Sequence, residues 1–240
     1  MHIRLTCTAL VVGCAAWSVG CASDSLDPGA GDAAGTGTAT LAIEGQVYAS
    51  TRHSGAHAAG DFDVDFAVRV LLNNQTVTTG TVTVTSSSGK VPLTFHADMR
   101  GVGWTGSADA YDEVYALDVV NGDDKAEGIR IDGPDIQTFL QPTEGATVDA
   151  SMPLPIKWSR SRAAGQTTLR TDSSPPFQID DTGAFNLPAG TLRADRQQSR
   201  QHTLRLVRTN SVTPTGAVDG STWSATVEND VDVTTPPLPF

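Results

Sequence analysis

The chain has 240 residues, of which 39% are hydrophobic and 18% are charged, with 23 Gly and 13 Pro. This composition supplies enough apolar residues for a folded core and excludes collagen, a coiled coil and a multi-span membrane protein. The net charge of −11 argues against a general nucleic-acid-binding protein, because neutralising phosphates needs a dominantly cationic surface.

The N-terminus has the features of a secretory signal. A short basic region precedes an apolar stretch at 5–19, and all three cysteines, Cys7, Cys14 and Cys21, lie at or before residue 21. A stretch of fifteen residues is too short to span a bilayer, which takes roughly 20. The remaining chain has no cysteine, so its fold must be held by its core rather than by disulfides.

The segment Ser18-Val19-Gly20-Cys21 resembles the lipobox of bacterial lipoproteins, the site of signal peptidase II. The resemblance implies a signal peptide at 1–20, cleavage after Gly20 and acylation (palmitate) of Cys21, which becomes the mature N-terminus. Ala22, rather than Asp, after this cysteine implies the outer membrane. Two alternatives stay open: the similar pattern ending at Cys14, and ordinary signal peptidase cleavage after Ala22.

A tether is expected over 21–40, which starts with the lipidated cysteine. The run at 27–38 is rich in Gly, Ala, Asp and Thr and has almost nothing to bury. Such a chain predicts a disordered linker whose 19 residues after Cys21 reach about 25 Å. It would hold a folded body away from the lipid headgroups.

From Leu41 onward the sequence alternates with a period of two, which is typical of β-strands with one wet face. The segment 61–70 places one set of residues on a single apolar face: Phe62, Val64, Phe66, Val68 and Val70. Further strands are expected at 81–85, 91–97, 101–105, 113–120 and 128–132. Asn121-Gly122 predicts a tight hairpin, because Asn and Gly tolerate the positive φ of such turns.

A second series of strands begins near Ile136. The segment 136–159, which ends in an alternating strand with Trp158, resembles the opening of immunoglobulin-like and fibronectin type III-like domains of bacterial surface proteins. Strands are then expected at 167–171, 176–179, 183–187, 202–209 and 222–233. The sequence therefore predicts an all-β protein of two antiparallel sandwiches, 41–135 and 136–234, before a Pro-rich tail at 235–240. One larger sandwich is the alternative.

Charge changes along the chain near the same place. Residues 21–155 contain 19 acidic and 6 basic residues, whereas 156–210 contain 9 basic and 4 acidic residues. This contrast supports a boundary near residue 135 and indicates two units that face different surroundings or each other.

Acidic and amide side chains crowd the predicted hairpin: Asn121, Asp123, Asp124 and Glu127. Calcium prefers carboxylate and carbonyl oxygens from turns, so these residues are a candidate calcium site. They lack the ligand order of an EF-hand, and a solvated acidic turn is the other interpretation.

Other patterns offer little chemistry. His53 and His57, near Asp61, Asp63 and Asp65, could bind zinc or copper, but Gly55 indicates a loop rather than a helix. No Gly-x-Ser-x-Gly is present, and His96 and His202 lie in predicted strands, where a structural role is expected.

Aromatic residues are the remaining candidates for ligand binding. Trp104, Trp158 and Trp223 lie in alternating segments and are expected in cores, whereas Tyr48 and Tyr111 lie near strand ends. The two tyrosines are therefore candidate sugar-stacking residues.

The leading hypothesis is a non-enzymatic outer-membrane lipoprotein that acts as a spacer or protein-interaction module. A carbohydrate-binding or adhesive module, with or without calcium, is the alternative, and a hydrolase is the third. No cofactor other than calcium is indicated. The partners expected are the membrane, through the lipid anchor, and an envelope protein or glycan.

Overall fold

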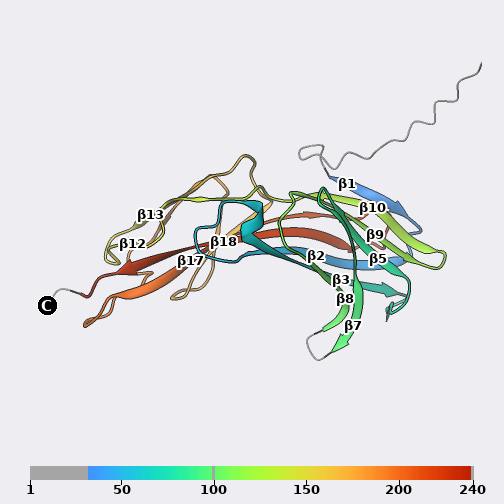
Figure 1. Cartoon of the computed structure of the whole chain (residues 1–240), viewed down its shortest axis with the longest axis horizontal. Helices are drawn as coiled ribbons and strands as arrows, with labels where there is room; N and C mark the ends of the chain where they lie inside the picture. The colour runs from blue at the N-terminus through green and yellow to red at the C-terminus, as the bar shows by residue number, and fades with distance from the viewer. Residues whose placement is uncertain (1–31, 99–100, 239–240) are drawn as a thin grey trace, which may run out of the picture.

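The computed structural model describes residues 32–98 and 101–238, and within them the protein is built almost entirely of β-strands. The strands form three sheets. Figure 1 shows an elongated molecule in which β17 and β18 run lengthwise through both halves. The expectation of an all-β sandwich fold is confirmed.

Sheet B is the largest sheet and forms one continuous layer. Its main path has the order β15 (Phe177–Ile179), β14 (Gln166–Thr171), β17 (Arg200–Val212), β18 (Thr222–Thr235), β2 (Leu41–Thr51), β3 (Phe62–Leu72), β8 (Gly101–Ala108) and β7 (Thr94–Asp98). Two short strands join it from the side, β4 (Gln75–Thr76) on β3 and β12 (Ala146–Thr147) on β18. A single turn of 3-10 helix, η1 (Ala59–Asp61), precedes β3.

Two smaller sheets cover the inner face of sheet B. Sheet A has the order β1 (Ala33–Gly37), β10 (Asp124–Asp132), β9 (Val114–Asn121), β5 (Thr81–Ser86) and β6 (Gly89–Pro92). Sheet C has the order β11 (Phe139–Gln141), β13 (Leu154–Trp158) and β16 (Ala184–Leu187). The hairpin predicted at Asn121-Gly122 joins β9 to β10, with Gly122 at φ 63°.

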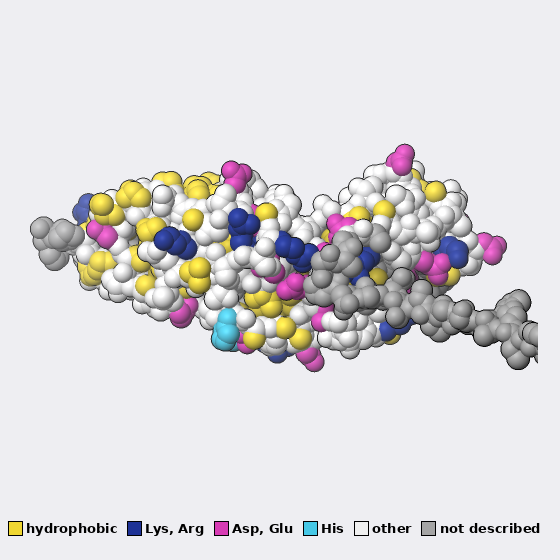
Figure 2. Space-filling view, turned by 90° about the horizontal axis from the view of Figure 1, so that it is seen from above, with side chains coloured by type: hydrophobic (Ala, Val, Ile, Leu, Met, Phe, Trp, Pro, Cys, Tyr) yellow, Lys and Arg dark blue, Asp and Glu magenta, His cyan; other side chains and the backbone are white. Residues whose placement is uncertain are grey.

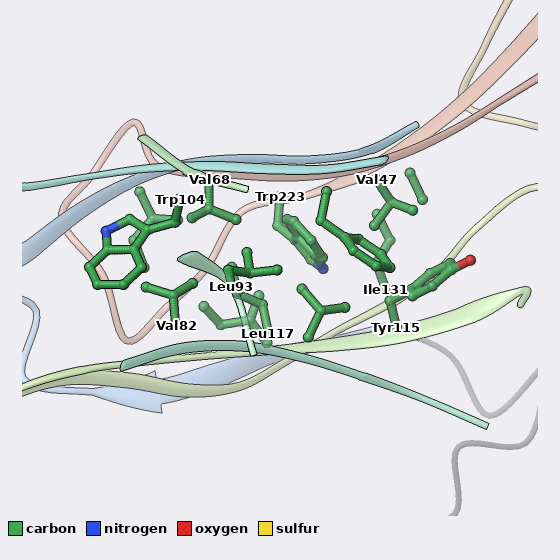
Figure 3. Close-up of a cluster of buried hydrophobic side chains, with 14 of the residues drawn as sticks. Val47, Val68, Val82, Leu93, Trp104, Tyr115, Leu117, Ile131 and Trp223 are labelled. Carbon is green, nitrogen blue, oxygen red and sulfur yellow. The ribbon is translucent and has the colours of Figure 1, made fainter. Parts of the chain in front are cut away.

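Sheet A and sheet B enclose the first apolar core. The face predicted for 61–70 is confirmed: Phe62, Val64, Phe66, Val68 and Val70 are at most 2% exposed. Figure 3 shows Val47, Val68, Trp104 and Trp223 opposite Val82, Leu117, Tyr115 and Ile131 between two layers of strands. We call this half the first unit.

Sheet C and the other end of sheet B enclose a second apolar core, which defines the second unit. It contains Ile156 and Trp158 of β13, Leu169 of β14 and Leu204 and Leu206 of β17. The core positions expected for Trp104, Trp158 and Trp223 are confirmed, since these side chains are 6%, 2% and 0% exposed.

Strand β18 serves both cores. Trp223, Ala225 and Val227 belong to the first core, and Val231 and Val233 belong to the second. These five residues are all odd-numbered, so sheets A and C pack against the same face of sheet B. Strand β18 therefore continues through both cores.

Two features differ from the expectation. Strand β18 pairs with β2 in parallel over Thr222–Glu228, so sheet B is mixed rather than purely antiparallel. Residues 33–37, expected within the disordered tether, form β1, which pairs with β10. The physical reason is that a strand with little to bury is held by backbone hydrogen bonds, including Thr38 N–H to Lys125 O at 2.9 Å and Thr215 N–H to Ala34 O at 2.9 Å.

Candidate functional site

The outer face of sheet B, away from both cores, carries a network of polar side chains that solvent can reach. Even-numbered residues of β2 and β18 point to this face, because their odd-numbered neighbours fill the cores. Tyr48 of β2 lies here, and its hydroxyl donates a hydrogen bond of 2.6 Å to Oε2 of Glu228 on β18. We call this surface, with Tyr48, Arg170, Arg205, Glu228 and Asp230, the outer platform.

Two arginines from neighbouring strands flank Glu228. Arg170 Nη1 of β14 lies 3.7 Å from Glu228 Oε2, and Arg205 Nε of β17 lies 3.9 Å from Glu228 Oε1. Arg205 Nε also lies 3.8 Å from Asp230 Oδ2. The arginine side chains are about half exposed (50% and 52%), whereas those of Glu228 and Asp230 are only 13% and 18% exposed. Cations therefore stand above carboxylates that lie close to the sheet.

The network shifts the acidity of two of its members. Burial, followed by the hydrogen bond to Glu228, raises the pKa of Tyr48 to about 12. Burial also raises the pKa of Asp230, and Arg205 opposes this effect. The Oδ1 atom of Asp230 is buried and has no hydrogen-bond partner among the described residues.

The outer platform is suited to binding rather than to covalent chemistry. Tyr and Arg are the residue types enriched in recognition surfaces, because each combines a large contact area with fixed hydrogen-bonding groups. A tyrosine ring also offers a face on which a sugar ring can stack. Tyr48, the acceptor Glu228 and the two arginines would serve either kind of partner.

A cavity of about 190 Å³ lies where the two units meet. It is lined by Asp32, Asp132, Gly133, Pro134, Arg162, Ala163 and Asn210. Its walls are bonded to one another: Asp132 N–H donates to Asp32 Oδ1 at 2.7 Å, and Asn210 Nδ2 donates to Asp132 O at 2.7 Å. Arg162 lies 3.3 Å from Asp132 and 3.5 Å from Glu113. The arrangement cross-links the first unit to the second.

A buried ion-pair network continues from this cavity into the protein. Arg208 of β17 is 0% exposed and lies 2.9 Å from Asp181 and 3.1 Å from Asp135. Its Nη1 donates to the carbonyl oxygen of Asp135 at 2.7 Å. Burial would raise the pKa of Asp135, but the Ser161 N–H and then Arg208 lower it below its ordinary value. This network joins the segment between the units to the long strand that both share.

The predicted calcium residues are near one another in sequence but are engaged separately. Asp124 Oδ1 accepts a hydrogen bond from Thr40 at 2.6 Å, Asn121 Oδ1 accepts one from Thr79 at 3.3 Å, and Glu127 pairs with Lys125 at 2.8 Å. Asp123 is exposed in the turn. Among residues 32–98 and 101–238, no group of three or more His, Cys, Asp or Glu side chains is placed to hold a metal ion.

Asp61 lies near both of the candidate loop histidines. His53 Nε2 lies 3.5 Å from Asp61 Oδ1, and His57 Nδ1 lies 3.8 Å from Asp61 Oδ2. Asp63 instead pairs with Arg52 at 2.7 Å. Asp61 Oδ2 also accepts hydrogen bonds from the backbone N–H groups of His57 and Ala58, and these bonds hold the loop in this conformation.

Tyr111 is not at the surface, which corrects the expectation that it is a sugar-stacking residue. It is 3% exposed and its hydroxyl donates to Pro134 O at 2.7 Å. Its ring lies near those of Phe62 and Tyr115 in the first core. A buried carbonyl acceptor lets this tyrosine join the core without leaving its hydroxyl unpaired.

His202 has the structural role expected of it. The side chain is fully buried, with Nδ1 3.0 Å from Asp172 Oδ1 and Nε2 3.2 Å from Arg193 O. These contacts fasten the segments that contain Asp172 and Arg193 to β17.

The expected cleavage and lipidation residues, Gly20 and Cys21, lie outside the described residues. Within the described ranges, no helix has the length and apolar character needed to cross a membrane.

Comparisons with known proteins add little. No protein-family model and no curated protein matches the chain. Two crystal structures of a tri-modular GH5 (subfamily 4) endo-beta-1,4-glucanase from Bacillus licheniformis, one of them complexed with cellotetraose, match with 16% and 15% sequence identity and TM-scores of 0.27 and 0.28. The matches cover 82% of this chain but only 39% and 38% of the glucanase chains, so the chain spans well under half of that enzyme. Likeness at this level supports neither a fold assignment nor an activity.

Sequence reasoning found Tyr48 but missed its partners on the outer platform. Glu228, Asp230, Arg205 and Arg170 share the face of Tyr48 because each alternates with a core residue on its own strand. The alternation was visible in the sequence. The parallel pairing of β2 with β18, which brings Tyr48 beside Glu228, was not visible in the sequence, because these two residues lie 180 positions apart.

Proposed function

We propose that the chain is a non-enzymatic lipoprotein of the bacterial outer membrane, anchored at Cys21, whose elongated body is a spacer that presents the outer platform to a protein partner. The observation that carries the proposal is the unbroken ladder between β17 and β18, paired from Arg200 with Thr235 to Val212 with Trp223. A continuous ladder through both units opposes bending between them.

The junction supports the same conclusion. Units joined only by a linker usually move relative to each other. Here the buried Arg208 network and the bonds around the cavity cross the boundary, so the two halves are held as one body. A rigid body can hold the outer platform at a fixed place relative to its anchor.

The anchor is tested by fractionating cells that express the full chain. The Cys21→Ser variant should be lost from the membrane fraction, whereas the matched Cys14→Ser variant should remain there like the parent. Retention of the Cys21→Ser variant in membranes would refute the anchor.

The outer platform is tested by site-specific photocrosslinking in cells. A crosslinker in place of Gln46, which is exposed beside Tyr48 on β2, should give a discrete protein adduct, and a crosslinker in place of Lys90 at the edge of sheet A should not. Arg205→Glu should remove the adduct. An adduct that forms equally at both positions, or that survives Arg205→Glu, would refute this surface.

A glycan partner is the second candidate, and the position of Tyr48 on the solvent side of sheet B favours it. Tyr48→Ala should abolish glycan-array binding, whereas Tyr48→Phe should keep most of it, because stacking needs the ring and not the hydroxyl. Arrays run with calcium and with a chelator separate calcium-assisted binding from stacking alone. No binding by the parent protein under either condition would leave the protein partner as the proposal.

A further inference from the structure

The described chain enters the body at its middle and not at one end. Asp32 lines the cavity between the units, and its Oδ1 accepts the N–H of Asp132 at 2.7 Å. Strand β1 then runs over the first unit beside β10, on the side of the molecule formed by sheets A and C (Figure 1). An anchor that precedes Asp32 therefore connects to the body at the junction between the two units.

The distance between the proposed anchor and Asp32 is short. Only residues 22–31 separate Cys21 from Asp32. Ten residues cannot span more than about 36 Å even when fully extended. Strand β18 alone has 14 residues, which is about 46 Å at the usual rise. If the long axis of the body were perpendicular to the membrane, residues 22–31 would need much of their extended length to reach from the anchor to Asp32 at the junction of the units. If the long axis were parallel to the membrane, they would not.

The second unit carries exposed apolar side chains in and next to sheet C. Leu140 of β11 is 59% exposed, and Met152, in the loop that leads into β13, is 60% exposed. Figure 2, which views the side of the molecule formed by sheets A and C, shows hydrophobic side chains over the half that contains β12 and β13. Large exposed apolar residues on one face mark a surface that meets a partner or a membrane.

Cations accompany these apolar side chains. Lys157 of β13 is exposed opposite Gln141 of β11, and Arg160 is exposed just after β13. Neither makes an ion pair within the part of the chain that the structure describes. Apolar side chains interspersed with Lys and Arg are the combination that binds an anionic lipid surface.

We propose that this surface of the second unit, defined by Leu140 and Lys157 of sheet C and by Met152 and Arg160 of the adjoining loops and called the membrane-facing roof, lies against anionic phospholipid headgroups while the body is anchored at Cys21. The inference rests on the proposed lipoprotein function. A contact of so few side chains is weak by itself, but a short covalent link gives it a high effective concentration at the bilayer.

One consequence joins this surface to the outer platform. Sheets A and C cover one face of sheet B, and Tyr48 lies on the other. A membrane-facing roof therefore turns the outer platform away from the bilayer, toward a partner.

The test measures which face of the anchored protein meets lipid. The lipidated chain is purified from membranes and reconstituted in vesicles of phosphatidylethanolamine and phosphatidylglycerol (3:1). Because the processed chain has no other free thiol, Leu140→Cys and Gln46→Cys each provide one site for an environment-sensitive fluorophore. A lipid-borne nitroxide should quench the label at 140 at least twofold more than the label at 46.

Charge variants identify the lipid contribution. Lys157→Glu with Arg160→Glu should reduce quenching at 140 by at least half, whereas the matched pair Arg69→Glu with Arg170→Glu, exposed on the opposite face, should leave it unchanged. Vesicles without phosphatidylglycerol should act like the first pair.

The outcomes separate the two proposals. If the protein fails to float with the vesicles, the lipid anchor fails and the orientation fails with it. If it floats but both labels are quenched equally, only the membrane-facing roof is refuted. Protection of the label at 140 that appears only after outer-membrane proteins are added would also refute it, in favour of a protein partner.

Discussion

Arg208 Nη2 lies 3.1 Å from Asp135 Oδ1, and the Arg208 side chain is buried, with 0% of its surface exposed. Asp135 follows β10 of sheet A, and Arg208 lies within β17, which runs through both units. The pair therefore fastens the chain at the point where the two cores separate. Gln137 and Asn229, both 0% exposed, continue this polar layer, and Asn229 Nδ2 donates to Gln137 O at 2.7 Å.

Removing the cation should destabilise the whole protein. Arg208→Leu leaves Asp135 and Asp181 buried without their partner, which costs about 3–5 kcal/mol for a buried pair broken on one side. Urea unfolding monitored by tryptophan fluorescence measures the loss. Arg205→Leu is the control, because its side chain is 52% exposed and surface pairs contribute at most about 1 kcal/mol. Equal losses in the two variants would contradict a buried junction.

Acid should weaken the same junction. The pKa of Asp135 is lowered in the folded protein, so the folded state binds fewer protons there than the unfolded state does. Its contribution to stability is then present above the ordinary value of 3.8 and is lost as the pH falls through the folded pKa. Asp135→Asn should flatten the fall of the unfolding free energy below about pH 4. Asp123→Asn, exposed in the β9–β10 turn, should keep the steeper fall of the parent.

Much of the fold was predictable because strands with one wet face carry a direct signal. The alternation over 61–70 identified β3 and its buried face, and Asn121-Gly122 identified the hairpin between β9 and β10. Strand β1 carried no such signal, since its Ala and Gly residues contribute backbone hydrogen bonds and little apolar area. A sequence pattern reports burial, and β1 is held mainly by pairing.

The candidate site was less predictable for a related reason. Arg208 lies on the same face of β17 as the core residues Leu204 and Leu206, yet an arginine in a strand is normally assigned to solvent, and its burial is explained by Asp135 and Asp181. Tyr111 shows the same limit, because its acceptor is the carbonyl of Pro134, which leaves no mark in the sequence.

Close packing across the parallel pair gives a further prediction. Gly45 of β2 is paired with Trp223 of β18, and a Cβ at Gly45 would lie 2.5 Å from Cε3 of the fully buried indole. Gly45→Ala should therefore displace Trp223 and cost about 1–3 kcal/mol. Gly60→Ala is the control, since nothing lies within 4 Å of its Cβ position, and it should change stability by less than about 0.5 kcal/mol. A neutral Gly45→Ala variant with unchanged tryptophan emission would contradict this packing.

The tyrosines provide a spectroscopic test of the outer platform. The chain has three, Tyr48, Tyr111 and Tyr115, and burial raises the pKa of each above its ordinary value of 10.0. The folded protein should therefore show almost no phenolate absorbance at 295 nm near pH 10.5, and all three should ionise together when the chain unfolds.

Tyr48 should be the first to ionise, at about pH 12, because the other two lie in the first core. Glu228→Gln removes the carboxylate that accepts its hydroxyl, so one third of the total absorbance change should move to lower pH, while circular dichroism remains that of the folded protein. Asp230 makes no contact with Tyr48 that would produce this change, so Asp230→Asn serves as the control. If one third of the absorbance change already occurs near pH 10 in the parent, Tyr48 is not held by Glu228, and the outer platform loses the contact that joins β2 to β18 on that face.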